Sequence, residues 1–545
     1  MNNKVLRFVL VLLTTSFGIT LNGQPLENGE KRPKLVVGII VENMRPDYID
    51  RYWDKFQDDG FKKLYNEGVV CTNFKIEQHI QSYATGTATL FTGVYPASHG
   101  IISPDWYDRV TSKEVNCVED DYYFTVGADT ESGNASATKL TANTLSDNLK
   151  VFTQGKSKVF SVALNTSTAV LSAGHAADGA YWLDEESGRM ISSSYYINTF
   201  PDWVRIFNSN NYTDKYAHRN WTTLLPLISY EGNIEDDYLF EKGYFEEFKT
   251  FPHVVNKYVK RMENYRPIKT VPWGNQIISD FVSELLENEK VSDDENTDFL
   301  SVAFSSMDYE NGSFGPVSIE MEDTYLRLDQ HIASLLSTIE TKFGNENVLV
   351  FLTSNTSASY PVDYLKEEFN LAVGSFSPES AFALLTSLLN ITYGEEKWIE
   401  NISGQQVYFD HKLIENSKVD KEEMIETAAT FINQFEGVKI TIPAHDLERG
   451  ASGPNIQAHI YNSYNKKRSG DFLYALEEGW QPTYKFEKVN YTDQTHIPLV
   501  FYGNGTKKQV IKERYNAADL VPTLAELIGI PPPDRSAGKI IKGIH

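Results

Sequence analysis

Five short apolar runs constrain the fold more than any other feature of this sequence. Each is rich in Val, Ile, Leu or Phe and is bounded by polar residues, which is typical of strands buried on both faces of a sheet. The runs are KLVVGIIVEN (34–43), KVFSVALN (158–165), DFLSVAFSSMD (298–308), NVLVFLTSN (347–355) and IPLVFYG (497–503). Amphipathic segments such as 321–344 separate them. This alternation predicts an α/β fold, with a doubly wound, mostly parallel sheet and helices on both faces.

Two stretches interrupt the alternation, and we expect both to be insertions. Residues 176–270 are rich in Tyr, Trp, Asn and Asp and have weak periodicity, so we expect a cap packed over the sheet. Residues 365–480 form the second insertion, with a helix expected over 421–435. The cap aromatics either anchor a partner or pack the cap onto the sheet. They include Tyr195, Tyr196, Trp203, Tyr212 and Trp221.

The amino terminus predicts export. Lys4 and Arg7 precede an apolar stretch over residues 8–21, so we expect a signal peptide at residues 1–23 and a mature domain over 24–545. A retained anchor is the alternative, but the run is shorter than the ~20 residues that span a bilayer. No later stretch is long enough to be a transmembrane segment. We therefore expect a periplasmic, cell-surface or secreted protein.

The net charge of −24 over 545 residues argues against nucleic acid and anionic membranes as partners. The partner that we expect from the sequence is another protein of the cell envelope or a glycan.

The sequence contains two cysteines, Cys71 and Cys117. In an oxidising compartment an even pair often forms a disulfide. We therefore predict a structural Cys71–Cys117 bridge, worth about 4 kcal/mol of stability if it is unstrained. Two separate buried thiols are the alternative.

Three of the apolar runs end in polar residues, at Glu42, Asp308 and Asn355. In open α/β sheets, ligands bind at the carboxyl ends of the strands. Carboxylates at neighbouring strand ends can hold metal ions there. Solvated strand ends are the alternative on residue type alone.

Longer motifs carry a family resemblance across nearly the whole mature chain. The sequence resembles the alkaline phosphatase superfamily, in its type I phosphodiesterase/nucleotide pyrophosphatase-like branch, and the bacterial single-chain alkaline phosphatases. The matching segments are RPKLVVGIIVENMRPDY (32–48), ATLFTGVYPASHGIISPDWYD (88–108), LSAGHAADGAYW (171–182), FGPVSIEMEDTYLRLD (314–329), YNKKRSGDF (464–472), THIPLVFYG (495–503) and ADLVPTLAELIGIPPP (518–533).

This resemblance implies two zinc ions held by Asp and His side chains, and a Thr or Ser nucleophile. At the matching ligand positions this chain keeps Asp308 and has Glu42 in place of an Asp. The other ligand positions carry Gly312, Asn355, Thr356 and Glu487. Because a zinc site needs about four strong donors, we expect no pair of zinc ions and no resident cofactor.

The catalytic positions implied by the resemblance are substituted as well. Tyr83 stands at the nucleophile position, with Ser82 one residue off register. The positions of the phosphate-contacting groups hold Pro104, Asn165 and Ser167. The Lys and Arg expected there would stabilise charge in the transition state, and they are absent.

Three functional hypotheses follow. The first is an exported pseudoenzyme that keeps the phosphatase fold, has lost its chemistry, and acts as a binding or scaffold component of the cell envelope. The second is a phosphate- or sulfate-ester hydrolase with a rebuilt site, where Glu42, Asp308 and Glu487 hold one Ca²⁺ or Mg²⁺. The third is an intact two-zinc phosphatase or phosphodiesterase whose register has been misread. The sequence favours the first.

Overall fold

The computed structural model describes residues 31–230, 235–241, 243–245, 247–306, 314–450, 456–483 and 495–544. The expected signal peptide lies outside these residues. Within them, no helix combines the length and apolarity needed to cross a membrane.

An eleven-stranded mixed sheet runs through the main body of the protein. Its five central strands, β10 to β7, are parallel, while β17, β8 and β5 run antiparallel to neighbours. The short β19 (Tyr515–Asn516) also pairs with β2. Across the sheet the order is β18 (Gln509–Ile511), β2 (Val69–Lys75), β17 (His496–Gly503), β10 (Val348–Thr353), β1 (Leu35–Glu42), β9 (Asp298–Ser305), β6 (Val159–Ala163), β7 (Gly179–Leu183), β8 (Met190–Ser193) and β5 (Thr125–Val126).

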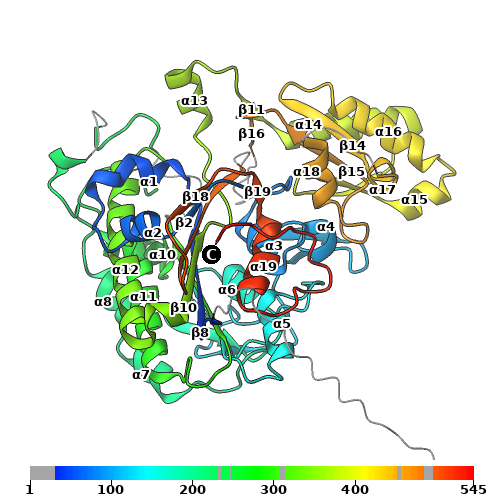
Figure 1. Cartoon of the computed structure of the whole chain (residues 1–545). Helices are drawn as coiled ribbons and strands as arrows, with labels where there is room; N and C mark the ends of the chain where they lie inside the picture. The colour runs from blue at the N-terminus through cyan, green and yellow to red at the C-terminus, as the bar shows by residue number, and fades with distance from the viewer. Residues whose placement is uncertain are drawn as a thin grey trace, which may run out of the picture.

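Helices cover both faces of this sheet, as the apolar runs predicted (Figure 1). Alternate side chains of β1 enter opposite cores, with Val37 and Ile39 in one and Val36 and Ile40 in the other. The first core includes α1 (Asp47–Tyr52), α2 (Phe61–Glu67), α7 (Asp202–Ser209), α8 (Tyr212–Ala217), α9 (Val255–Met262), α10 (Arg266–Lys269), α11 (Pro272–Asn288) and α12 (Ile319–Phe343). The second includes α3 (Tyr83–Thr92), α5 (Leu145–Phe152), α6 (Thr166–Ala173) and α19 (Leu520–Leu527).

The stretch 176–270 begins by adding β7 and β8 to the main sheet. The rest of its described residues include α7 to α10, which contribute to the first core. Trp203 and Trp221 are buried there, and the Tyr196 hydroxyl donates hydrogen bonds to the carbonyls of Val170 and Gly174. These aromatic side chains therefore pack the segment onto the body of the protein.

A second, smaller unit occupies residues 375–482 and projects from the main body (Figure 1). Its antiparallel sheet has the order β12 (Ile399–Ser403), β13 (Gln406–Phe409), β15 (Phe472–Leu476) and β14 (Val438–Pro443). A two-stranded pair, β11 (Ser375–Phe376) with β16 (Gln481–Pro482), ties its ends together. Its helices are α14 (Pro378–Tyr393), α15 (His411–Asn416), α16 (Lys421–Ile432), α17 (Ala444–Glu448) and α18 (Ile456–Ser463).

The remaining elements connect the two units. The hairpin of β3 (Asp105–Asp108) and β4 (Lys113–Asn116) follows α4 (Pro96–His99), and α13 (Val362–Phe369) precedes the smaller unit. Hydrogen bonds join the smaller unit to the main body, including one of 2.9 Å between His79 Nε2 and the Tyr474 carbonyl.

The predicted disulfide is absent, because Cys71 and Cys117 are both free in the structure. Cys71 lies in β2 and Cys117 follows β4, and each thiol is buried in the second core. Burial raises the pKa of Cys71 to about 12 and that of Cys117 further, so both sulfurs are held as protonated thiols. An apolar core that already shields both side chains needs no bridge between them.

We expect the native protein to react with a thiol reagent such as DTNB at a negligible rate at pH 8. After unfolding in guanidinium chloride without a reductant, both thiols should react, because burial alone protects them. Absence of reactive thiols in the unfolded chain would show that the disulfide forms.

Candidate active site

The carboxyl ends of β1, β9 and β10 meet at one edge of the sheet, and hydrogen bonds lock them together. The Ser306 hydroxyl donates to the Glu42 carbonyl at 2.5 Å, which joins the end of β9 to that of β1. The Met44 amide donates to Ser354 Oγ at 3.0 Å, which joins β1 to β10. These hydrogen bonds therefore hold the polar residues at the strand ends in place near the start of α3.

Glu42 ends β1, and its side chain is buried with 1% exposure. Asn165 Nδ2 donates to one carboxylate oxygen at 2.7 Å, and the Thr168 hydroxyl donates to the other. Both donors lie at the start of α6, Asn165 as its N-cap residue. Hydrogen bonds of this kind hold a carboxylate in one orientation, and an oriented carboxylate is a common ligand of cations.

Asn43, the next residue, connects the predicted site positions to one another. Its backbone is left-handed, with φ of 61°, an uncommon conformation that Asn tolerates better than most residues. Its Nδ2 donates to the Tyr83 hydroxyl at 2.7 Å, and its Oδ1 accepts from the Thr356 hydroxyl at 2.6 Å. Sequence reasoning missed this residue. The available signal was an Asn directly after a buried strand.

Tyr83 is the first residue of α3, and Ser82 is its N-cap. Ser82 and Thr85 form a capping box, in which each side chain accepts from the other residue's backbone amide. Such a cap fixes where the helix begins. The Ser82 hydroxyl is thus engaged in the helix start, while the Tyr83 hydroxyl is aligned by Asn43.

Asn355 and Thr356 follow β10 and are both buried. The Asn355 amide donates to the Thr87 hydroxyl at 3.1 Å, and its Oδ1 has no hydrogen-bond partner in the described part of the chain. Gly86 of α3 packs on the backbone of Asn355 so closely that an added Cβ would lie 1.7 Å from its carbonyl oxygen. This contact sets the position of α3 against the strand ends.

The remaining predicted positions fall into two groups. Asn165 and Ser167 lie at the start of α6, where Asn165 contacts Glu42, and Pro104 precedes β3. Asp308, Gly312 and Glu487 lie outside the described residues, so their part in a cation site stays a prediction.

The donor set in the described residues does not fit a pair of zinc ions. Zinc prefers thiolate, imidazole and carboxylate ligands. Only Glu42 among the described ligand positions offers one, because Asn355 and Thr356 carry an amide and a hydroxyl. One carboxylate with amide and hydroxyl oxygens suits a single hard cation better.

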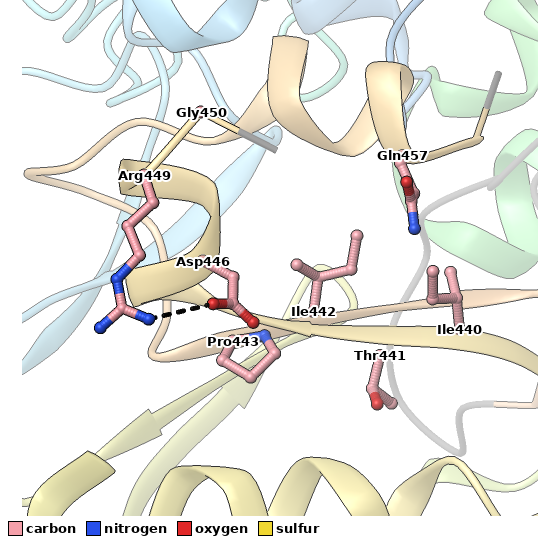
Figure 2. Close-up of a pocket in the computed structure, with 8 residues that line it drawn as sticks. All are labelled: Ile440, Thr441, Ile442, Pro443, Asp446, Arg449, Gly450 and Gln457. Carbon is pink, nitrogen blue, oxygen red and sulfur yellow. Dashed lines mark ion pairs between the residues drawn. The ribbon is translucent and has the colours of Figure 1, made fainter. Parts of the chain in front are cut away.

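A cavity of about 340 Å³ lies away from these strand ends, in the smaller unit (Figure 2). Ile440 and Ile442 of β14 form its apolar floor, and Asp446 and Arg449, paired at 3.6 Å, stand beside it. Near it, Glu426, His445 and Asp446 place one ligand atom each within 4.8 Å of the others. These residues are partly exposed, and a 2.9 Å bond between His445 and Glu426 accounts for their approach.

Comparison with known proteins assigns the family. The model of the type I phosphodiesterase/nucleotide pyrophosphatase family matches residues 36–498. The chain belongs to this family. The two ends of the matched range fall in β1 and β17, so it takes in every strand of the site.

Curated relatives within the family are close in length to this chain. Alkaline phosphatase PhoV of Synechococcus elongatus is 34% identical over 518 residues, which cover 94% of this chain and 92% of that protein. Alkaline phosphatase PafA of Elizabethkingia meningoseptica is 33% identical over 525 residues, covering 95% and 96%. The crystal structure of wild-type PafA superposes with a TM-score of 0.88 at 32% identity, covering 94% of this chain and 99% of that one.

These findings contradict the expectation of an inactive pseudoenzyme. PhoV and PafA, which match this chain over 94–95% of its length, are both named as alkaline phosphatases. The expectation rested on the number of zinc-ligand positions that are substituted. That number argues against catalysis by two zinc ions and does not bear on hydrolysis by other groups. The comparisons favour a phosphatase, which corresponds to the hydrolase alternative.

Proposed function

We propose that this protein hydrolyses phosphate monoesters, using a catalytic set that differs from a two-zinc site. One observation carries the proposal. Proteins named alkaline phosphatases match 94–95% of the chain at 33–34% identity, and a solved one superposes with a TM-score of 0.88. We propose that the phosphoryl group binds at the polar edge formed by the ends of β1, β9 and β10, where hydrogen bonds join these strands.

The Tyr83 hydroxyl is the proposed nucleophile. Its oxygen attacks phosphorus, the bond to the ester oxygen breaks, and the alcohol leaves after taking up a proton. Water then attacks the phosphotyrosine, which releases inorganic phosphate and restores the phenol. The hydrogen bond from Asn43 Nδ2 at 2.7 Å orients the phenolic oxygen and stabilises negative charge on it.

Glu42, Asp308 and Glu487 are the residues that we propose to hold a single Ca²⁺ or Mg²⁺. Such a cation, when bound, neutralises charge on the phosphoryl oxygens. Asn165 and Thr168 keep the Glu42 carboxylate in one orientation for this purpose.

We also propose that the enzyme acts outside the cytoplasm. The basic and apolar residues of segment 1–23 support this location.

The deciding experiment measures kcat/KM of the purified protein on three chromogenic substrates. They are p-nitrophenyl phosphate, bis-p-nitrophenyl phosphate and p-nitrophenyl sulfate, each with EDTA or with added Ca²⁺, Mg²⁺ or Zn²⁺. We expect the monoester to be hydrolysed fastest and EDTA to suppress the rate at least about 10²-fold. Asp308→Asn should have the effect of EDTA. Hydrolysis no faster than in buffer under every condition would refute the proposal.

A further inference from the structure

Three metal-ligating side chains gather on the smaller unit, away from the strand-end site. Glu426 lies on α16, and His445 and Asp446 are consecutive residues of α17. Each offers one ligand atom, and these three atoms all lie within 4.8 Å of one another. Among the described residues, no other group of three His, Cys, Asp or Glu side chains comes so close together. This geometry makes the group a candidate site for one metal ion.

Packing of the backbone holds the two helices that carry these side chains in place. The Thr441 hydroxyl of β14 donates to the Ala429 carbonyl of α16 at 2.9 Å. The Ala444 amide at the start of α17 donates to the Asp471 carbonyl at 2.8 Å, and Leu447 of α17 is buried with 2% exposure. Binding of an ion therefore orders a few side chains and no backbone, which keeps its entropic cost small.

His445 directs one ring nitrogen at both carboxylates. Its Nε2 lies 2.9 Å from Glu426 Oε1 and 3.8 Å from Asp446 Oδ1. An imidazole nitrogen carries at most one hydrogen, so a hydrogen bond explains the contact with Glu426 and leaves the approach of Asp446 unexplained. A divalent cation in the place of that hydrogen contacts all three ligand atoms, because it accepts the nitrogen lone pair and binds both oxygens.

The separations of the ligand atoms fit a tetrahedral zinc ion. Zinc binds imidazole nitrogen and carboxylate oxygen at ~2.0–2.2 Å, which places neighbouring ligands of a tetrahedron about 3.4 Å apart. The observed 2.9 and 3.8 Å lie on either side of that value. The Glu426 and Asp446 side chains are 51% and 45% exposed, so both carboxylates have room to turn toward the ion.

The charges around the group also favour a cation. Arg449 pairs with two carboxylates, at 3.6 Å from Asp446 and 3.8 Å from Glu422. With Glu426, three carboxylates share this guanidinium, and its side chain is 67% exposed, so solvent screens both contacts. An imidazole that binds a metal is neutral, so the charge of a divalent ion offsets the excess of negative charge.

We propose that Glu426, His445 and Asp446 bind one Zn²⁺ ion on the surface of the smaller unit. One imidazole and two carboxylates suit zinc, whereas Ca²⁺ and Mg²⁺ prefer a shell of oxygens alone. Water takes the fourth position. Asp446 also lines the cavity shown in Figure 2, so the ion lies at the edge of that cavity. The ion joins α16 to α17 and is separate from the cation proposed at the strand ends.

The test uses the full mature protein after treatment with EDTA and dialysis. Isothermal titration with ZnCl₂ and thermal unfolding at pH 7.5 are measured for wild type, His445→Gln and Asp446→Asn. Wild type should bind Zn²⁺ and gain ~3 °C in Tm at a hundredfold excess over Kd. Each variant should bind this ion at least about 10²-fold more weakly, because it keeps only two of the three ligands. Circular dichroism checks that both variants keep the wild-type fold.

Cobalt gives an independent measurement at the same site. Co²⁺ added to the EDTA-treated wild type should produce the visible absorption bands of a four-coordinate ion, and ZnCl₂ should remove them. Neither His445→Gln nor Asp446→Asn should show these bands. Bands of equal strength in His445→Gln would show that the imidazole is not a ligand and would overturn the proposal.

His411→Gln and Asp308→Asn are the matched controls. His411 Nε2 bonds to the carboxylate of Asp471 at 2.6 Å, so His411→Gln makes the same change at a pair with one carboxylate. Asp308→Asn removes a carboxylate from the strand-end site. Both controls should keep the Zn²⁺ binding and the Tm gain that His445→Gln loses.

Three results would overturn the proposal. The first is loss of Zn²⁺ binding in either control but not in His445→Gln, which would place the ion elsewhere. The second is a wild-type protein that binds no Zn²⁺, and the third is tighter binding of CaCl₂ than of ZnCl₂ at this site. None of these outcomes depends on phosphatase activity, which is scored separately.

Discussion

Tyr83→Phe is expected to lower kcat for p-nitrophenyl phosphate by at least about 10³-fold, with a small change in KM. The substitution removes the one oxygen that is proposed to form the covalent intermediate, while the ring still fills its space at the start of α3. Steady-state kinetics on both proteins, at equal occupancy by metal, give the ratio. A variant that keeps wild-type kcat would show that another group attacks phosphorus.

Tyr48→Phe is the control for this change. Tyr48 is fully buried in α1, and its hydroxyl has no partner in the described structure. Removing that hydroxyl should leave kcat unchanged and should not reduce stability. A comparable loss of activity in Tyr48→Phe would point to general disturbance of the fold instead of nucleophile removal.

Gly86→Ala is expected to lower the free energy of unfolding by about 3 kcal/mol. Alanine favours a helix over glycine by ~1 kcal/mol, so helix propensity alone predicts the opposite sign. The clash reverses it, because the new Cβ would lie 1.7 Å from the Asn355 carbonyl oxygen, which cannot move without shifting the end of β10. Guanidinium chloride unfolding, followed by circular dichroism, measures the difference.

Gly505→Ala provides the comparison for the same chemical change without a clash. Gly505 has φ of 81°, and an added Cβ there would meet nothing within 4 Å. Alanine should lower the free energy of unfolding by only ~1–2 kcal/mol, which is the cost of holding a residue with a Cβ in the left-handed conformation. A Gly86→Ala protein at least as stable as wild type would mean that α3 and β10 are not in the contact described.

The architecture could be predicted from sequence because a strand that is buried on both faces forms a continuous apolar run. All five apolar runs lie in the main sheet, and the amphipathic segment 321–344 is within two residues of α12. The direction of a strand is not visible in its composition. The apolar run that forms β17 resembles those of the parallel strands, so its antiparallel direction could not be predicted. The sheet of the smaller unit was also missed, because its strands are short and lie inside a stretch without strong periodicity.

The site was harder to predict, for a physical reason. The residue types at the expected ligand positions indicate that a two-zinc site is excluded. The residues that replace those ligands act through contacts in the folded protein, and their spacing in the sequence does not reveal these contacts. Asn43 lies forty residues from Tyr83 and 313 from Thr356, yet it bonds to both. The same limitation led the ligand positions to be interpreted as an inactive site, although an aligned hydroxyl remained at the start of α3.

The pairing of β2 has a consequence for synthesis of the chain. Among the described residues its neighbours are β17, β18 and β19, so the strands that pair with residues 69–75 come from residues 496–516. At ~5–20 residues per second, β2 leaves the ribosome on the order of 20–80 s before β17. During that interval both of its edges are open to strands of other chains. Holdase chaperones should therefore bind nascent chains that stop before residue 496 far more than complete ones, and deletion of the last fifty residues should yield aggregates in place of a shortened enzyme.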